Sequence, residues 1–378
     1  MTTMNKPLRN TSVDLIRTAA LIGICVVNLP FLALPPAQAI GIPDAHGDRV
    51  AAFLIEFLFQ GKFFLIFSFI FGWGVHIQIQ SAARAGVQFK GRYFRRLIGL
   101  AIFGCLHAVL VFPGDILLLY AFLGCLLWPF RNCAPRTLIR TAMSMVGLEL
   151  ITLVVLAVLL SIYPTTPVNH ALDYNFVGST LTRISEWPGT FGFLILFQGP
   201  LAFGAILLGL AAAKAGFFEP GSRGQKQLTR ITPLLLLQAV LTNLAFALAP
   251  KEGDLVELMG LLSFAVGAPL MSAVYINVLL RYSTWINLPD VLIAAGRNSL
   301  TAYVLQGLIA GVVFGGYGLG FFGELGNLAL IPLAVGIALI SMTLTGLIAK
   351  YAGQAPLEKI LRLITYGPQR NGGKEQRA

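Results

Sequence analysis

Charged residues are scarce in this sequence. Asp, Glu, Lys and Arg make up 11% of its 378 residues, whereas soluble globular domains carry about 25%. So few charges cannot cover a water-exposed surface, which excludes a soluble enzyme, a nucleic-acid-binding protein and a disordered scaffold. Hydrophobic residues reach 56%, and the mean hydropathy is +0.78. The composition therefore predicts an all-α fold, a polytopic bundle of membrane-spanning helices.

The sequence also has few cysteines, few histidines and few long polar stretches. The chain has four cysteines and four histidines, and neither set has the spacing of metal ligands, so no metal site is predicted. The longest polar stretches are residues 164–189 and the C-terminal tail. Both are too short to form a soluble domain with a core of its own.

Long apolar runs, in contrast, are plentiful. A helix needs about 20 apolar residues to cross the hydrocarbon core of a bilayer, and ten stretches qualify. The third and fourth are short and are predicted to form a helical hairpin that turns at Phe112-Pro113-Gly114-Asp115. The predicted spans are 13–34, 52–80, 97–112, 114–130, 141–163, 190–213, 231–249, 256–280, 290–314 and 327–350.

Basic residues are distributed very unevenly between the two sides of this arrangement. If the N-terminus is cytoplasmic, 21 Lys and Arg residues lie on the cytoplasmic side, and only Arg49, Arg183 and Lys251 lie on the opposite side. Cytoplasmic loops of membrane proteins are enriched in Lys and Arg. This uneven distribution therefore predicts both termini in the cytoplasm, in a multi-pass protein of the bacterial inner membrane. It also accounts for the net charge of +11 without a nucleic-acid partner.

The chain is expected to divide into three parts. Residues 1–140 form an N-terminal helical half, 141–214 are connecting spans, and 215–378 form a C-terminal helical half that includes an amphipathic helix at 354–365 suited to the membrane surface. For the first span a cleaved signal peptide ending near Ala37-Gln38-Ala39 is an alternative. The charged residues Asp14 and Arg17 beside its apolar run argue against cleavage.

Two groups of polar residues fall inside the predicted spans, where ionisable side chains are costly and therefore candidates for function. The inner group lies at the cytoplasmic ends of the first and ninth spans. An arginine among Asn, Ser and Thr is typical of a site for phosphate or carboxylate, and the alternatives are a structural ion pair or an arginine that reaches the interface. The candidate residues are Asp14, Arg17, Arg297, Asn298, Ser299, Tyr303 and Gln306.

The outer group lies in the opposite half of the bilayer. His107 and Asp115 are eight residues apart across the predicted hairpin turn, and a histidine oriented by a carboxylate is a general-base arrangement. A structural, hydrogen-bonded histidine is the alternative. The candidate catalytic residues are His107, Asp115, Lys62, Asn28 and, in the first outer loop, His46.

Four segments resemble the YeiB-like bacterial membrane family, catalogued as a domain of unknown function. They are SVDLIRTAALIGICVVN (12–28), GKFFLIFSFIFGWG (61–74), HAVLVFPGDILLLYAFLG (107–124) and GRNSLTAYVLQ (296–306). The resemblance covers nearly the whole chain, and the named domain of that family corresponds roughly to residues 215–370.

The first span is also similar to that of the heparan-alpha-glucosaminide N-acetyltransferases, which belong to a broader transmembrane acyltransferase superfamily. In those enzymes a catalytic histidine follows the Asn of the VN pair, matched here by Asn28, in the first outer loop. This sequence departs from that pattern, because LPFLALPPAQA follows instead and His46 comes later. Either His46 or His107 would take over the role, or the chain carries out different chemistry.

These features and resemblances favour an integral membrane acyltransferase. It would bind no resident cofactor and would use a cytoplasmic acyl-CoA as co-substrate, with its phosphates on Arg17, Arg297 and Asn298. Lys62 or Asn28 would stabilise the oxyanion, and the acceptor at the outer face would be an envelope glycan or a small molecule. Membrane lipids are expected neighbours, and a homo-oligomer is possible in principle.

Two other functions stay open at the level of sequence. One is a transporter or flippase for an anionic metabolite or lipid, which Glu149 in the fifth span would suit through proton coupling. The other is a non-catalytic assembly or envelope-stress factor.

Overall fold

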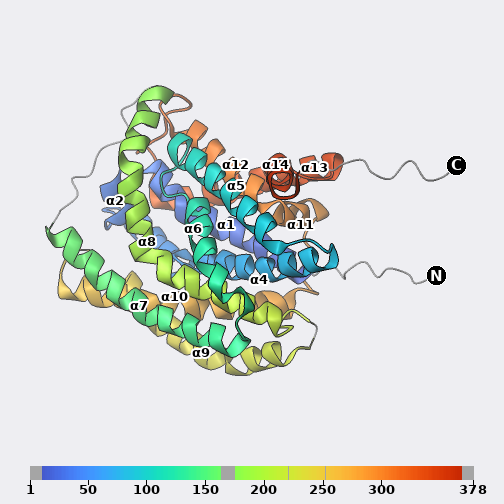
Figure 1. Cartoon of the computed structure of the whole chain (residues 1–378). Helices are drawn as coiled ribbons and strands as arrows, with labels where there is room; N and C mark the ends of the chain where they lie inside the picture. Colours follow the sequence, from blue (N-terminus) through green and yellow to red (C-terminus); the bar gives the residue numbers. More distant parts are fainter. Residues whose placement is uncertain (1–10, 163–174, 220, 252, 368–378) are drawn as a thin grey trace.

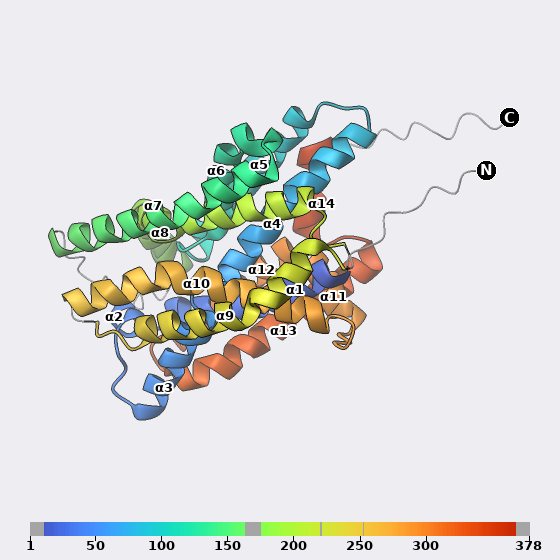
Figure 2. The same ribbon diagram turned by 90° about the horizontal axis from the view of Figure 1, so that it is seen from below.

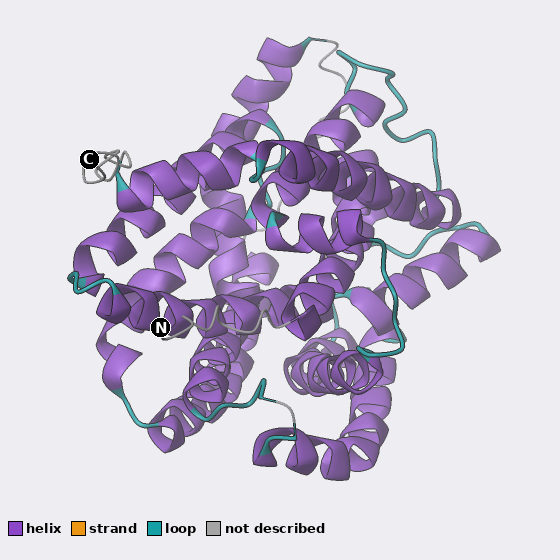
Figure 3. Cartoon of the chain, turned by 90° about the vertical axis from the view of Figure 1, so that its right-hand side faces the viewer, coloured by secondary structure: helices purple, strands orange, loops and turns teal. Residues whose placement is uncertain are grey.

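A computed structural model describes residues 11–162, 175–219, 221–251 and 253–367. Every regular element within these ranges is a helix, and the long helices pack side by side in a bundle (Figures 1 and 3). Eight helices in the described part of the chain are long and apolar enough to cross a membrane. The predicted all-α membrane bundle is therefore confirmed.

The elements account for all ten predicted spans. Two shorter apolar segments, Ile116–Asn132 and Ser299–Phe314, occupy the fourth span and the end of the ninth. The helices are α1 (Thr11–Ala33), α2 (Pro36–Ile40), α3 (His46–Leu54), η1 (Ile55–Phe59), α4 (Lys62–Arg84), α5 (Phe89–Leu110), α6 (Ile116–Leu127), η2 (Trp128–Asn132), α7 (Pro135–Ile162), α8 (Phe176–Lys214), α9 (Arg223–Ala247), α10 (Leu255–Tyr282), α11 (Asp290–Arg297), α12 (Ser299–Phe314), α13 (Asn327–Ala352) and α14 (Pro356–Tyr366).

Helix α1 forms the centre of the bundle. It packs against α4, α11, α12 and α13, and its side chains Ile16, Ala20 and Leu21 are fully buried. Around it, α5 pairs with α6, α7 with α8 and α9 with α10, as Figure 2 shows from below. The start of α1 and the end of α14 lie at the same end of the bundle, on the right in Figure 1. Polar residues on α1 are therefore surrounded by other helices.

The second span is interrupted, which its apolar sequence alone did not predict. Helix α3 passes into the π-helix η1, and Gly61 then adopts a left-handed conformation (φ 77°) before α4 begins. Glycine suits this position because it has no Cβ to clash there. Two side chains from α10 donate hydrogen bonds to carbonyl oxygens at the break: Tyr275 to Leu58 O at 3.0 Å, and Ser272 to Lys62 O at 2.9 Å.

Helix α8 begins well before its predicted span of 190–213. Residues 176–189, expected as part of an outer loop, are helical. The helix contains Pro188, and its first half runs across the bundle while its second half runs along it (Figures 1 and 2). A proline inside a helix removes a backbone hydrogen bond and favours such a bend. The remainder of that loop, residues 163–174, lies outside the described residues.

Candidate active site

His107 and Asp115 meet at the outer turn between α5 and α6. The Asp115 carboxylate caps the start of α6, accepting hydrogen bonds from Leu117 N (2.8 Å) and Leu118 N (3.0 Å) through Oδ2. Its Oδ1 lies 2.9 Å from His107 Nδ1, and both side chains are buried. An ionised carboxylate can only accept hydrogen bonds, so Nδ1 carries the proton and Nε2 is left as a base.

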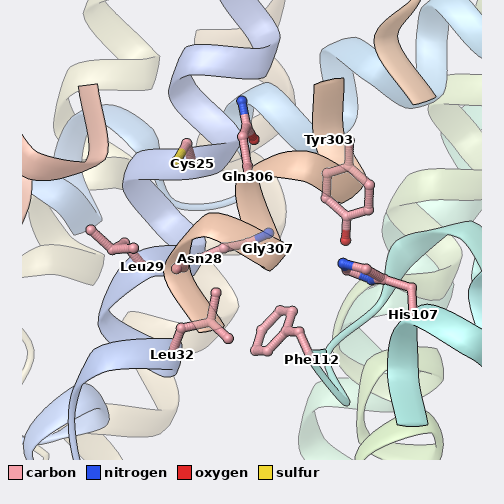
Figure 4. A pocket seen from close by; sticks show the side chains of 10 residues that line it. Cys25, Asn28, Leu29, Leu32, His107, Phe112, Tyr303, Gln306 and Gly307 are labelled. Atoms are coloured by element: carbon pink, nitrogen blue, oxygen red, sulfur yellow. The ribbon is translucent and has the colours of Figure 1, made fainter. Parts of the chain in front are cut away.

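The free nitrogen of His107 faces a small buried cavity. Nε2 is buried and has no hydrogen-bond partner within the described part of the chain. The cavity has a volume of about 20 Å³, enough for about one water molecule. Its lining, most of which is labelled in Figure 4, consists of Cys25, Asn28, Leu29, Leu32, His107, Phe112, Tyr303, Gln306, Gly307 and Ala310. The cavity thus lies between α1, α12 and the outer end of α5.

Helix α12 closes one side of the cavity. The Tyr303 ring centre is 5.1 Å from that of His107, and its hydroxyl lies 3.5 Å from Asp115 Oδ1. Gln306 Nε2 donates to Leu21 O at 3.2 Å, which joins α12 to α1. A Cβ atom on Gly307 would lie 2.7 Å from His107 Nε2. Glycine at this position therefore permits the close approach of α12 to the histidine.

The first half of α8 covers the outer end of α5. Arg183 Nε donates to Val109 O at 2.9 Å, two residues beyond His107. Phe176 packs edge-on against Tyr317, with ring centres 5.2 Å apart. This segment therefore ties the outer end of α5 to the region that follows α12.

A cluster of charged residues lies at the other end of α1. Asp14 Oδ2 accepts a hydrogen bond from Arg297 Nε at 2.6 Å, and Asp14 Oδ1 lies 3.8 Å from Arg17 Nη1. Arg17 also lies over the Trp73 ring, 5.8 Å from its centre. The Arg96 guanidinium on α5 is near enough to repel Arg17 electrostatically. We name Asp14, Arg17, Arg96 and Arg297 the inner cluster.

At the predicted anion site around Asn298 and Ser299, the backbone amides and the Asn298 side chain contact groups of the chain itself. Helix α12 starts at Ser299, but its first free amides, Leu300 N and Thr301 N, donate to Glu358 Oε1 of α14 at 2.8 and 3.1 Å. Asn298 is turned away from Asp14, and its Oδ1 accepts Ala355 N at 2.9 Å. The protein's own carboxylate therefore takes the place expected for a bound anion.

Four further candidate residues lie elsewhere than the sequence indicated. Lys62 does not line the cavity: it is fully buried at the start of α4 and donates to Glu56 O at 2.7 Å, because the break at Gly61 turns it back toward η1. His46 is exposed at the first residue of α3 and is also absent from the cavity lining. Tyr303 and Gln306, assigned to the inner group, line the outer cavity instead. Asn28 lines it as predicted.

Two charged residues, Arg96 of the inner cluster and Glu358 close to it, were not singled out from the sequence. Arg96 was counted as a loop residue, but α5 begins at Phe89, about two turns before the predicted span. Glu358 sits on the predicted amphipathic helix, and Arg96 also interacts with it electrostatically. Arg96 could have been singled out if the segment from Phe89 to Arg96 had been assigned to the start of the helix and not to the loop.

Comparisons with known proteins agree with the resemblance seen in the four segments. The chain is 26% identical to the uncharacterised protein YxaH of Bacillus subtilis, with 93% of each chain covered. It is 26% identical to the uncharacterised protein YeiB of Escherichia coli, over 94% of this chain and 96% of that one. It is 27% identical to an uncharacterised 39.9 kDa protein of the amylase 3′ region in Bacillus acidopullulyticus, over 94% and 93%. No solved structure matches the chain.

The C-terminal part carries a recognised family signature. Residues 212–368 match the family model described as "Protein of unknown function (DUF418)", close to the 215–370 expected for the named domain. The predicted resemblance is thus confirmed: the chain is similar to the bacterial YeiB and YxaH proteins along nearly its whole length, and residues 212–368 match the DUF418 family model.

Proposed function

We propose that the protein is an integral membrane acyltransferase of the bacterial inner membrane. It would transfer an acyl group from cytoplasmic acyl-CoA to a hydroxyl or amine of an acceptor at the outer face. The observation that carries this proposal is the His107–Asp115 pair, whose free Nε2 faces a buried cavity. A buried carboxylate that orients a histidine with an unoccupied basic nitrogen is an arrangement suited to general-base catalysis.

The proposed reaction uses this pair directly. His107 Nε2 takes the proton of the acceptor hydroxyl or amine while the acceptor atom attacks the thioester carbonyl carbon. The Asp115 carboxylate stabilises the resulting imidazolium. Asn28 and Tyr303 would donate hydrogen bonds to the carbonyl oxygen as it becomes negative. When the carbon–sulfur bond breaks, the imidazolium returns the proton to sulfur, and CoA leaves as the thiol.

The inner cluster would hold the phosphates of the donor. It has three guanidinium groups and one carboxylate, Asp14, and Glu358 adds a second carboxylate near Arg96, so a net positive charge remains. Tyr303 is four residues beyond Ser299, where α12 begins after the break that follows Arg297, and a helical rise of 1.5 Å per residue places it about 6 Å along the axis of α12. A pantetheine arm extending from the inner cluster therefore has a short path along α12 to His107.

The cavity has to widen for this reaction. A volume of about 20 Å³ is far below the roughly 300–1,000 Å³ of sites that bind small molecules. The Gln306–Leu21 hydrogen bond joins the two helices on either side. Separation of α12 from α1 at this contact is the simplest way to admit an acyl chain.

The transporter alternative has less support. Glu149, its proposed proton carrier, is buried between α7 and α8 and accepts Leu201 N at 3.3 Å, directly after Pro200. Oε2 of Glu149 thus has a partner next to Pro200, Oε1 is buried without one in the described part of the chain, and Glu149 does not line the cavity. Carriers often use the free carbonyl groups of an interrupted helix to bind ions. In the interrupted second span of this chain, Leu58 O and Lys62 O accept hydrogen bonds from Tyr275 and Ser272.

A thiol-release assay tests the proposal. Purified protein is incubated with a panel of acyl-CoAs and candidate acceptors, and free CoA is measured. We expect His107→Gln to lower turnover at least 100-fold while acyl-CoA binding persists. His46→Gln is the matched control, because His46 is exposed and outside the cavity, and it should keep wild-type turnover. Loss of activity in His46→Gln but not in His107→Gln would reject the proposed base. Absence of both thiol release and acyl-CoA binding across the panel would reject the enzyme.

A further inference from the structure

A second cavity, unrelated to the proposed active site, lies at the predicted cytoplasmic face. It is formed between α4, the start of α5 and η2, and its volume is about 370 Å³, within the range of small-molecule sites. Its polar lining consists of Gln88, Lys90, Arg131 and Asn132, and its aromatic lining of Phe89 and Trp128. None of the residues that line it is acidic. The cavity is therefore positively charged.

Arg131 is held in a fixed position within it. Its guanidinium lies over the Trp128 ring, 3.8 Å from the centre, and Nη1 donates to Trp128 O at 2.8 Å. A guanidinium fixed in this way keeps further N–H donors in a planar array that matches a phosphate group. Lys90 adds a flexible, exposed ammonium group. Together they offer two cations to one anion.

The aromatic lining is already engaged. Trp128 stacks with Phe89 and Tyr93, at ring-centre distances of 5.9 and 5.6 Å, and also contacts Phe94. With Arg131 on the same ring, Trp128 has little free surface on which a nucleotide base could stack. The cavity thus offers charge and hydrogen bonds rather than a stacking platform.

Its position indicates the source of the anion. Trp128 ends the apolar helix α6, and Trp is enriched where a membrane helix reaches the headgroup layer. Basic pockets between membrane helices on the cytoplasmic side are suited to acidic lipid headgroups. We propose that this cavity binds the phosphodiester headgroup of an anionic phospholipid, with Arg131 and Lys90 as its cationic contacts. The proposal does not depend on the acyltransferase reaction.

Quenching of Trp128 fluorescence by brominated lipids tests this assignment in detergent-purified full-length protein. The Trp128 component is obtained by comparison with Trp128→Phe. Brominated phosphatidylglycerol should quench it at lower concentration than brominated phosphatidylcholine. Each basic residue near an anionic headgroup contributes roughly 1 kcal/mol, so Lys90→Gln should weaken the effect of phosphatidylglycerol about 5-fold and Lys90→Gln with Arg131→Gln about 30-fold.

A matched pair controls for overall charge. Arg223→Gln with Lys226→Gln removes two exposed basic residues outside the cavity, from the first turn of α9, and should leave quenching unchanged. Equal weakening in both double variants, or equal quenching by the two lipids, would overturn the proposal. Competition by glycerol phosphate at the concentrations effective for phosphatidylglycerol would assign the cavity to a soluble phosphate instead. Because Lys90 is exposed, its single variant keeps the test decisive if the double variant unfolds.

Discussion

At the scale of single residues, Asp115 has two separable tasks. Oδ1 orients His107, and Oδ2 caps α6. Asparagine is also a good helix cap but is neutral and cannot stabilise an imidazolium. We expect Asp115→Asn to lower turnover 10²- to 10⁴-fold with little change in thermal unfolding. Steady-state kinetics and a melting curve on the same preparation measure both effects, and a large drop in melting temperature with intact turnover would contradict this division.

Gly307 sets the distance between α12 and His107. Its added Cβ would lie 2.7 Å from His107 Nε2 and 2.8 Å from Val111 Cγ1. We expect Gly307→Ala to displace the imidazole, to lower turnover at least tenfold and to cost about 1–3 kcal/mol of stability through overpacking. Gly336→Ala on α13 is the control, because nothing lies within 4 Å of its added Cβ. Similar turnover in the two variants would show that this spacing is not critical.

Sequence reasoning succeeded where a contact is local. His107 and Asp115 are joined by one short turn, so their pairing follows from spacing, and Asp14 and Arg17 share a face of one helix. Sequence reasoning failed where the direction of a side chain depends on a break in a helix. Lys62 does not reach the cavity, because the break at Gly61 turns its side chain back toward η1. Tyr303 and Gln306, predicted to belong to the inner group, line the outer cavity instead. The contacts of Tyr303 and Gln306 with distant segments are set by tertiary packing, which apolar periodicity does not register.

At the scale of elements, α14 is fastened to the start of α12. Glu358 accepts Leu300 N, Thr301 N and the Thr301 hydroxyl, the last at 2.6 Å. Hydrogen bonds to a charged group contribute a net stabilisation of about 1.5–3 kcal/mol each. We expect Glu358→Gln to lower the melting temperature, whereas Lys359→Gln, an exposed neighbour, should not. Unchanged melting of Glu358→Gln would mean that α12 does not need this cap.

Element boundaries were the least predictable part of the fold. Each of the ten apolar stretches coincides with one or more helices, and eight helices of the described chain are long and apolar enough to cross a membrane. This part was predictable because the length of an apolar run is visible in the sequence of each segment. The π-helix η1, the division between α11 and α12 at Asn298 and the early start of α8 were not foreseen. Each depends on hydrogen bonds or bends that apolar periodicity does not register.

At the scale of the whole molecule, the topology is open to a direct test. The uneven distribution of Lys and Arg predicts that the loop after α4 is cytoplasmic and the loop after α9 is outside. A phosphatase reporter fused after Gly253 should be active, because this enzyme folds only outside the cytoplasm, and one fused after Gly86 should be inactive. The reverse pattern would invert both proposed faces, including that of the lipid cavity.

The small cavity beside His107, which lies between α1, α12 and the outer end of α5, has a consequence for fidelity. A base that can activate an alcohol can also activate water, so an open site would waste acyl-CoA by hydrolysis. Here the cavity of about 20 Å³ has room for about one water molecule beside the imidazole, and an acyl chain can enter only when the helices separate. The binding energy of the acceptor, and not that of water, would then drive the separation of the helices. The thioester would therefore be cleaved only when an acceptor is bound.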